Sequence, residues 1–154
     1  MEITLLDTDI FSEVLKRKHA HVEKNANGYY QQFERYTIST ITVLEIVKGL
    51  HKVNREAELQ IFLENISGAD ILTLTTEGAE LAGRIYAELE RTGQSVGRAD
   101  PIIAAIAISN NMLLSTGNTK HYKRIQNLGY KLRLTNWKTG DGKEVPALES
   151  DQSS

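Results

Sequence analysis

The sequence predicts a three-layer α/β/α fold, in which a central, mainly parallel sheet of four to five strands carries helices on both faces. Short apolar or β-branched segments alternate with longer segments of helical periodicity along most of the chain. This alternation is typical of parallel sheets, whose right-handed crossover connections place helices on both faces. The length of 154 residues and the lack of internal repeats indicate a single domain.

The expected strands are short, and the first is "ITLL" at residues 3–6, an apolar run that ends at the acidic "DTD". The segment "YTIST" at residues 36–40 is rich in β-branched residues and predicts the second strand. Three further segments, "ADILTL", "MLLST" and "YKLRL", lie at residues 69–74, 112–116 and 130–134. Together these segments supply the strands of the expected sheet.

Seven segments between the strands have apolar residues at helical spacing or carry helix-start signals. They cover residues 10–18, 21–35, 42–53, 55–66, 76–93, 101–111 and 119–125. The segment "PIIAAIAISNN" at 101–111 is almost entirely apolar, which indicates a buried helix. Residues 138–154 are polar, aperiodic and rich in glycine and serine. We therefore expect a folded domain over residues 1–137 and a disordered tail over 138–154.

The composition is ordinary for a soluble globular chain, with 40% hydrophobic and 25% charged residues. No segment approaches the roughly 18 consecutive apolar residues of a membrane span, and the start "MEITLLDTDIF" does not resemble a signal peptide. The absence of cysteine excludes disulfides, thiolate zinc sites and a cysteine nucleophile. We expect a cytoplasmic protein that does not contact a membrane.

Charge is distributed unevenly along the chain, although the net charge is only −2. Residues 98–137 hold six lysines and arginines but one acid, Asp100, so the rest of the chain is strongly acidic. This asymmetry indicates either a local basic surface for an anionic partner or an ordinary solvated helix face.

Four carboxylates lie where predicted strands end or predicted helices begin: Asp7, Asp9, Glu45 and Asp100. Three of them have a structural alternative as helix caps. Asp9 precedes a helix, Glu45 completes a capping-box pattern with Thr42, and Asp100 stands directly before a proline. Asp7 follows a buried strand and has no evident capping role.

Both interpretations place these acids together, because strand C-termini and helix N-termini meet along one edge of a parallel sheet. Carboxylates packed in one crevice raise each other's pKa unless a cation neutralises them. Hard oxygen ligands without cysteine or a paired histidine motif favour Mg²⁺ or Mn²⁺. The sequence therefore favours a metal site over unrelated caps.

The basic segment "TGNTKHYKRI" lies next to this expected crevice. His121 is a candidate substrate contact, whereas the other three histidines read as solvated loop or helix-end residues. Tyr122 could either stack on a base or pack against the sheet.

Three blocks of the sequence resemble the signature regions of PIN-domain ribonucleases, and most of all the VapC toxins of toxin–antitoxin modules. The blocks are "LLDTDIFSEVL", "ISTITVLEIVKGL" and "GRADPIIAAIAISNNMLLSTGNTKHYKRI". They occur in the family's order and spacing, and the resemblance extends from about Ile3 to Trp137. It leaves only the tail uncovered.

The resemblance implies that Asp7, Glu45 and Asp100 are the catalytic metal ligands and that the metal is Mg²⁺ or Mn²⁺. Asn118 stands where the family often has a fourth acid, which weakens the case for a second tightly bound metal. Supporting or substrate-contacting roles are implied for Asp9, Thr116, Asn118, Arg98, Lys120 and His121.

The implied reaction is metal-dependent hydrolysis of RNA phosphodiester bonds in a tRNA, rRNA or mRNA, with 5′-phosphate and 3′-hydroxyl products. The resemblance also implies a homodimer and a cognate antitoxin protein that covers the active site, with DNA contacted only through the antitoxin. A candidate antitoxin groove lies beside two predicted helices at Ile10, Val14, Val43 and Val47, although these residues also suit an ordinary core.

Two other functions remain open from the sequence. One is a catalytically weak PIN-fold RNA-binding module, which Asn118 supports. The other is a haloacid-dehalogenase-like phosphatase, in which Asp7 would be phosphorylated and Asp9 would act as acid and base. Phe11 replaces the usual small hydroxyl residue of that phosphatase pattern, and no paired acids follow a later strand.

Overall fold

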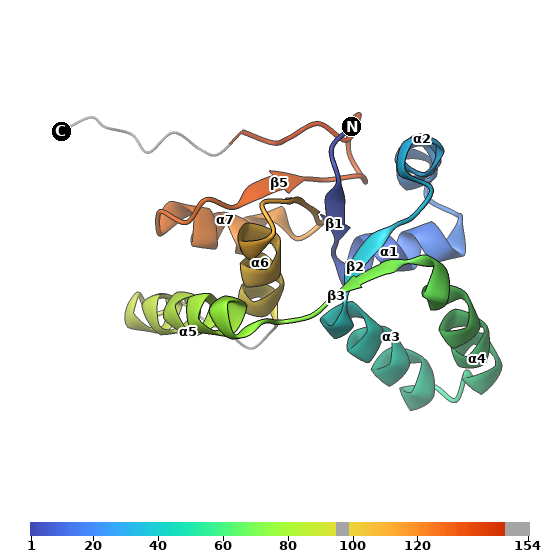
Figure 1. Cartoon of the computed structure of the whole chain (residues 1–154), viewed down its shortest axis with the longest axis horizontal. Coiled ribbons are helices and arrows are strands. Elements are labelled where there is room, and N and C mark those ends of the chain that lie inside the picture. The colour runs from blue at the N-terminus through green and yellow to red at the C-terminus, as the bar shows by residue number, and fades with distance from the viewer. Residues whose placement is uncertain (95–98, 147–154) are drawn as a thin grey trace.

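The computed structural model describes residues 1–94 and 99–146. Five parallel strands form one sheet in the order β3-β2-β1-β4-β5 (Figure 1). The strands are β1 (Thr4–Leu6), β2 (Thr37–Ser39), β3 (Asp70–Leu72), β4 (Leu113–Ser115) and β5 (Arg133–Thr135). The helices are α1 (Thr8–Lys16), α2 (Ala20–Phe33), α3 (Thr40–Lys52), α4 (Glu56–Asn65), α5 (Thr76–Arg91), α6 (Asp100–Ser109) and α7 (Thr119–Asn127), with a 3₁₀ turn at Ile66–Gly68. The predicted three-layer α/β/α fold is confirmed.

The strand order reverses at the centre of the sheet. The chain passes from β1 to β2 and β3 on one side, and then returns to place β4 and β5 on the other side of β1. Leu5 pairs with Leu114 across the β1–β4 contact. In open parallel sheets, such a reversal leaves a crevice at the carboxyl ends of the two strands that flank it. The residues that follow β1 and β4 therefore face the expected site.

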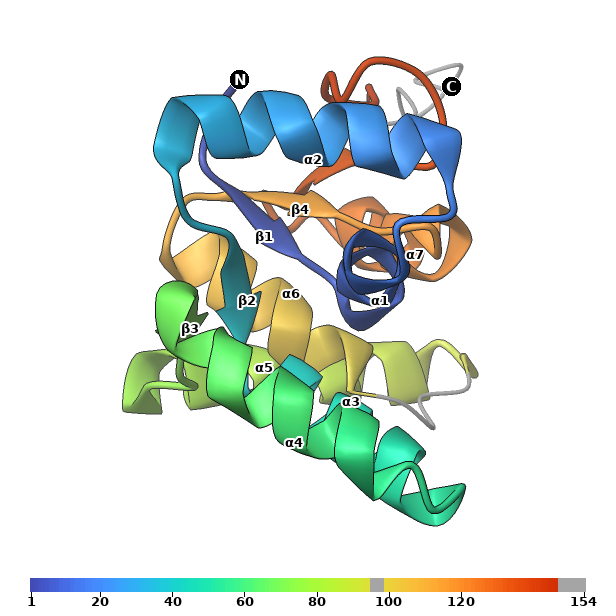
Figure 2. The ribbon, with the colours of Figure 1, turned by 90° about the vertical axis from the view of Figure 1, so that its right-hand side faces the viewer.

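Two apolar clusters lie on opposite faces of the sheet, because successive residues of a strand point to opposite sides. Leu5 joins a cluster with buried residues of α5, α6 and α7, whereas Leu6 joins a cluster with buried residues of α1, α2, α3 and α4. Figure 2 shows α1, α2, α3 and α4 on the side nearest the viewer. These two clusters hold the helical layers against the sheet.

Helix α6 is the buried helix that the apolar run predicted. Six of its ten residues are buried, and it packs against α5 and the sheet. Neither α6 nor any other helix in the described ranges has both the length and the apolar content needed to cross a bilayer.

The first part of the expected tail, residues 138–146, lies against the domain, and we call it the C-terminal strap. Val145 pairs with Leu134 of β5 in an antiparallel bridge. The buried side chain of Asn25 on α2 donates a hydrogen bond to the carbonyl of Trp137, at 3.1 Å, just before the strap. The expectation of a disordered tail does not extend to the strap, because backbone pairing to an edge strand requires no apolar pattern. Residues 147–154 lie outside the described residues.

Candidate active site

Asp7 lies at the crevice, directly after β1 and directly before α1. Its Oδ1 accepts a hydrogen bond from the backbone N–H of Thr8 at 2.9 Å, and its Oδ2 accepts one from the Thr116 hydroxyl at 2.8 Å. Asp7, for which no capping role was expected, is the N-cap of α1. The helix begins two residues earlier than predicted, so the interpretation of Asp9 as its cap is wrong. The carboxylate is buried, and residues that follow β1 and β4 donate hydrogen bonds to both of its oxygens.

The environment of Asp7 disfavours its negative charge. Burial and the nearby charge of Asp9 raise its pKa to about 7, with a smaller contribution from Asp100. The hydrogen bonds from Thr116 and Thr8 act in the opposite direction and lower it. The carboxylate can therefore exchange a proton near neutral pH, and a bound cation would favour its ionised form.

Tyr122 lies beneath the same carboxylates and is completely buried. Burial raises the pKa of its hydroxyl well above the usual value, and the charges of Asp7 and Asp100 add to this effect. Tyr122 therefore packs against the sheet, and the alternative in which it stacks on a base is wrong.

Glu45 reaches the crevice from α3, through a contact with the start of α1. Its Oε1 accepts a hydrogen bond from the Thr8 hydroxyl at 3.0 Å, and the same hydroxyl lies 3.0 Å from that of Thr42. The N-cap of α3 is Ser39, whose hydroxyl accepts from the backbone N–H of Thr42. Glu45 thus does not form the capping box that its spacing suggested, and it lies exposed beside Asp7's helix.

Asp100 is the first residue of α6 rather than its cap. The capping position is Ala99, whose carbonyl accepts from the backbone N–H of Ile103 at 3.1 Å. Within the described part of the chain, the Asp100 carboxylate makes no capping hydrogen bond. Its Oδ2 instead lies 3.5 Å from Nδ1 of His121, with 18% of the Asp100 side chain exposed. The interpretation of Asp100 as a cap is therefore wrong.

Asp9 reaches the turn between β4 and α7. Its Oδ1 accepts from the backbone N–H of Ile10 at 2.8 Å, and its Oδ2 accepts from that of Gly117 at 2.8 Å. The ammonium group of Lys138 lies 3.4 Å from the same Oδ2. Sequence reasoning missed Lys138, because it lies in the polar segment after the last strand and belongs to no motif.

Thr116 and Asn118 belong to this turn. The hydroxyl of Thr116, besides donating to Asp7, accepts from the backbone N–H of Asn118 at 3.0 Å. Asn118 occupies the N-cap position of α7, and its half-buried side chain makes no capping hydrogen bond within the described residues. Its amide therefore has no capping role in α7.

The donor set of this crevice suits a hard divalent cation. Asp7, Glu45 and Asp100 offer carboxylate oxygens, the ligands that Mg²⁺ and Mn²⁺ prefer. Burial first, and then the charges of Asp9 and Asp100, raise the pKa of Asp7, and a bound cation would offset both effects by favouring the ionised carboxylate. Within residues 1–94 and 99–146, however, no three acids or histidines lie close enough together to form a complete metal cage.

All but one of the residues expected to form the basic surface lie within the described part of the chain. Lys120 is exposed on α7, and His121 is partly exposed beside Asp100. Lys123 and Arg124 lie on the same helix and are half-buried. Arg98 lies outside the described residues.

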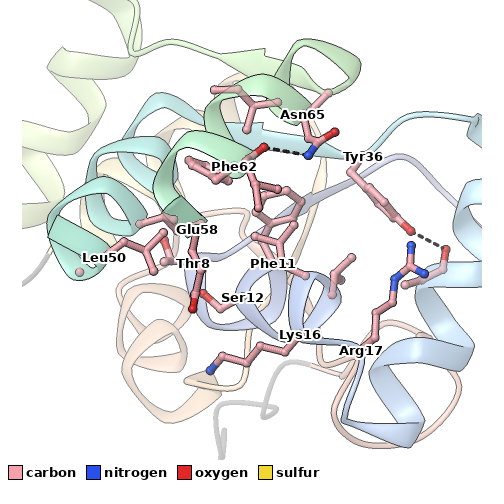
Figure 3. A pocket seen from close by; sticks show the side chains of 18 of the residues that line it. Thr8, Phe11, Ser12, Lys16, Arg17, Tyr36, Leu50, Glu58, Phe62 and Asn65 are labelled. Atoms are coloured by element: carbon pink, nitrogen blue, oxygen red, sulfur yellow. Dashed lines mark hydrogen bonds between the residues drawn. The ribbon is translucent and has the colours of Figure 1, made fainter. Parts of the chain in front are cut away.

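A groove of about 970 Å³ begins at the crevice and runs between α1, α2, α3 and α4 (Figure 3). Thr8 and Glu45 line it beside Asp7, and Phe11, Tyr36 and Phe62 form part of its apolar wall. Of the four residues that predicted a groove, Val14 lines it, whereas Ile10, Val43 and Val47 pack into the core. The groove is wider than expected because α2 and α4 also contribute to it.

Comparison with known proteins identifies relatives of this chain. The family model described as PIN domain matches residues 4–127. A "tRNA(fMet)-specific endonuclease VapC" from Shigella flexneri is 32% identical over 125 residues, which cover 80% of this chain and 92% of that protein. A protein of the same name from Salmonella typhimurium is 31% identical over 134 residues, which cover 86% of this chain and 96% of that protein.

A solved structure shares the same fold. The crystal structure of DNA-bound VapBC from Salmonella typhimurium matches 89% of this chain and 99% of its own chain, with a TM-score of 0.73 and 31% sequence identity. The chain therefore belongs to the PIN-domain family, within which its relatives are VapC ribonucleases. This assignment leaves the phosphatase alternative without support.

Proposed function

We propose that this chain is a Mg²⁺- or Mn²⁺-dependent endoribonuclease that acts as the toxin of a VapBC-type toxin–antitoxin module. The observation that supports the proposal is that the charges of Asp9 and Asp100 lie near enough to Asp7 to raise its pKa, while Glu45 contacts the neighbouring Thr8. The names of the relatives support the reaction, since two of them are tRNA(fMet)-specific endonucleases.

Asp7 and Asp100, together with Glu45, would hold the cation. When bound, a divalent cation would activate a water molecule and offset charge that develops on the scissile phosphate. The chain's own contribution is to orient these groups: Thr116 and the Thr8 backbone hold the Asp7 oxygens, and the Thr8 hydroxyl holds Glu45. Tyr122 is completely buried and lies close enough to Asp7 and Asp100 for their charges to raise the pKa of its hydroxyl.

The RNA backbone would lie along the basic side of the crevice. Lys120 and His121 are accessible on α7, and Arg98 precedes Asp100 in the sequence. Such cations hold phosphates without selecting bases, so the nature of the RNA would be read from its shape and local sequence. Asn118 would supply a neutral oxygen at the position where the resemblance to the family implies a fourth acid.

The protein partner of the chain is a cognate antitoxin. Its proposed binding site is the groove between α1, α2, α3 and α4. The groove combines apolar walls with three acids, Glu23, Glu45 and Glu58, and with three bases, Lys16, Arg17 and Arg55. An apolar segment would fit these walls, and a basic residue on it that reached Glu45 would cover the acids of the crevice. We also propose that the toxin is a cytoplasmic homodimer and that it contacts DNA only through the antitoxin.

The test compares two acids that each lie in the first turn of a helix. The purified chain with Mg²⁺ or Mn²⁺ should cleave a structured RNA such as tRNA, and a chelator should stop cleavage. Asp100→Asn should lower the cleavage rate by about 100-fold or more while the fold is kept, because a neutral amide is a poor ligand for the cation. Glu77→Gln in the first turn of α5 is the matched control and should cleave normally.

The alternative of an inactive RNA-binding module makes a different prediction. In that case the wild type and both variants would be equally inert toward RNA and equally harmless when expressed. RNA binding without cleavage at saturating cation would then replace the nuclease proposal.

A further inference from the structure

The C-terminal strap brings Lys138 to the active site, and several contacts fix the strap. The backbone N–H of Val145 donates to the carbonyl of Leu134 at 2.7 Å, and the Thr135 hydroxyl donates to the carbonyl of Lys143 at 2.8 Å. The strap starts directly after Trp137, which is completely buried. Lys138 is therefore anchored on both sides, although no sequence motif includes it.

Lys138 and Asp9 meet over a glycine that leaves room for both. The ammonium group lies 3.4 Å from Oδ2 of Asp9, and each side chain is about one-third exposed. A Cβ on Gly117 would lie 2.5 Å from that oxygen and 3.1 Å from Cδ of Lys138. Residue 117 must therefore be glycine for the carboxylate and the lysine to approach the turn so closely.

The turn beneath Lys138 is the one that holds Asp7. Gly117 donates its backbone N–H to Asp9, while the adjacent Thr116 donates its hydroxyl to Asp7. Thr116 also accepts from the backbone N–H of Asn118. Contacts thus run without a gap from the strap, through Asp9 and the turn, to the carboxylate that we assign as a metal ligand.

A partly exposed ion pair adds little to the stability of a fold. Its position suggests another purpose, because Asp9 would otherwise be an unpaired negative charge beside Asp7 and its orientation would depend on backbone N–H groups alone. The Lys138 ammonium group and the Gly117 backbone N–H both contact Oδ2 of Asp9, so the cation holds this carboxylate against the turn.

We propose that Lys138 is a positioning residue of the active site, which holds Asp9 against the turn at Gly117 and so keeps Thr116 in place to orient Asp7. The role rests on the proposed nuclease function, since it is the orientation of a metal ligand that Lys138 would maintain. Lys138 acts through other residues and touches neither RNA nor the reacting atoms.

The test uses the full chain and three variants. Lys138→Met removes the charge at similar length, Lys138→Arg keeps it, and Lys143→Met is the matched control on the same strap, with its side chain exposed and paired to Asp141. Thermal unfolding of each variant checks that it is folded. Two quantities are then measured: the hydrogen-exchange rate of the Gly117 amide, and kcat and KM for RNA cleavage.

A positioning role predicts that Lys138→Met lowers kcat by roughly tenfold, as is usual for residues that orient metal ligands. KM should change by less than about twofold, because ground-state binding of RNA is not involved. The Gly117 amide should exchange several-fold faster, Lys138→Arg should restore most of both properties, and Lys143→Met should match the wild type.

Three results would overturn the proposal. A raised KM with a weaker salt dependence and an unchanged kcat would make Lys138 a phosphate contact instead. Unchanged exchange at Gly117 would show that Lys138 does not hold the turn. An equal loss in Lys138→Arg would mean that charge is not what matters. If the wild type itself cleaves no RNA, the nuclease proposal fails, and the exchange measurement still decides whether Lys138 holds the turn.

Discussion

The starts of α1 and α6 each present a carboxylate at the same edge of the sheet, but they hold it in different ways. Asp7 is buried, caps α1 and accepts a second hydrogen bond from Thr116. Asp100 lies one position inside α6 and is more exposed, and its Oδ2 lies 3.5 Å from Nδ1 of the partly exposed His121. The Asp7 carboxylate thus takes part in the hydrogen bonds of the fold, whereas the Asp100 carboxylate is only positioned at the sheet edge by the start of α6.

This difference shows how a protein can gather like charges that repel each other. Desolvation penalises the buried carboxylate, and hydrogen bonds compensate only in part, so the pKa of Asp7 rises to about 7. Asp100 remains closer to solvent, which screens its charge. The ionised form of Asp7 therefore favours cation binding but lowers the stability of the fold without a cation. The ionised form of Asp100 has a smaller effect on stability, because its charge is screened by solvent.

The largest expected effect is on the pH dependence of stability without metal. The pKa of Asp7 is about 7 in the folded state and near 3.8 when unfolded, so between these values the folded state binds more protons. Stability should therefore fall as the pH rises from about 4 to about 7, by up to roughly 4 kcal/mol from this group. Urea unfolding at several pH values in chelator measures the decrease.

Two variants show whether Asp7 is the cause. Asp7→Asn should remove most of the decrease and should be more stable than the wild type at pH 8, although inactive. Asp100→Asn should leave most of the decrease in place, because Asp100 is only a minor cause of the shift at Asp7. Equal pH profiles for the wild type and Asp7→Asn would contradict this account.

A smaller effect is expected at the residue that holds Asp7. Thr116→Val keeps the shape of the buried side chain but removes its hydrogen bonds to the Asp7 carboxylate and the Asn118 backbone. Unfolding free energy should decrease by roughly 1–3 kcal/mol, since buried polar groups lose their partner. Chemical denaturation at pH 8 measures the loss, and a variant as stable as the wild type would show that Asp7 does not depend on Thr116.

The smallest effect on stability is expected at the partner of Asp100. His121→Gln removes a contact whose histidine side chain is 39% exposed. The free energy of unfolding should change by less than about 0.5 kcal/mol, because contacts between partly exposed polar or charged side chains contribute little. If His121→Gln lowered the free energy of unfolding as much as Thr116→Val, the contacts of Asp100 would contribute as much to stability as those of Asp7, and the contrast drawn above would be wrong. RNA cleavage by the same variant reports separately whether His121 contacts substrate.

Much of the fold was accessible from local patterns. The alternation of short β-branched segments and helical segments predicted all five strands and seven helices, and the apolar run after Asp100 predicted the buried α6. These predictions succeed because side-chain period and composition act within a few residues. The gathering of Asp7 and Asp100 at one edge also followed, since all strands of a parallel sheet end on the same side.

The contacts between distant segments were not accessible in this way. Asp100 looked like a helix cap, but the backbone starts α6 around Ala99 instead. Glu45 looked like half of a capping box, but its partner is Thr8, 37 residues away in the chain. Lys138 belongs to a polar segment without periodicity, and its pairing with Asp9 depends on how the strap packs.

The sequence by itself determined which residues form the sheet, which end of it carries the acids, and the family to which the chain belongs. Only the tertiary structure decided which acid is buried, how its pKa shifts, and that Lys138 reaches the site. The physical reason is that desolvation and charge coupling depend on distances between segments remote in the chain, whereas secondary structure depends mainly on neighbours.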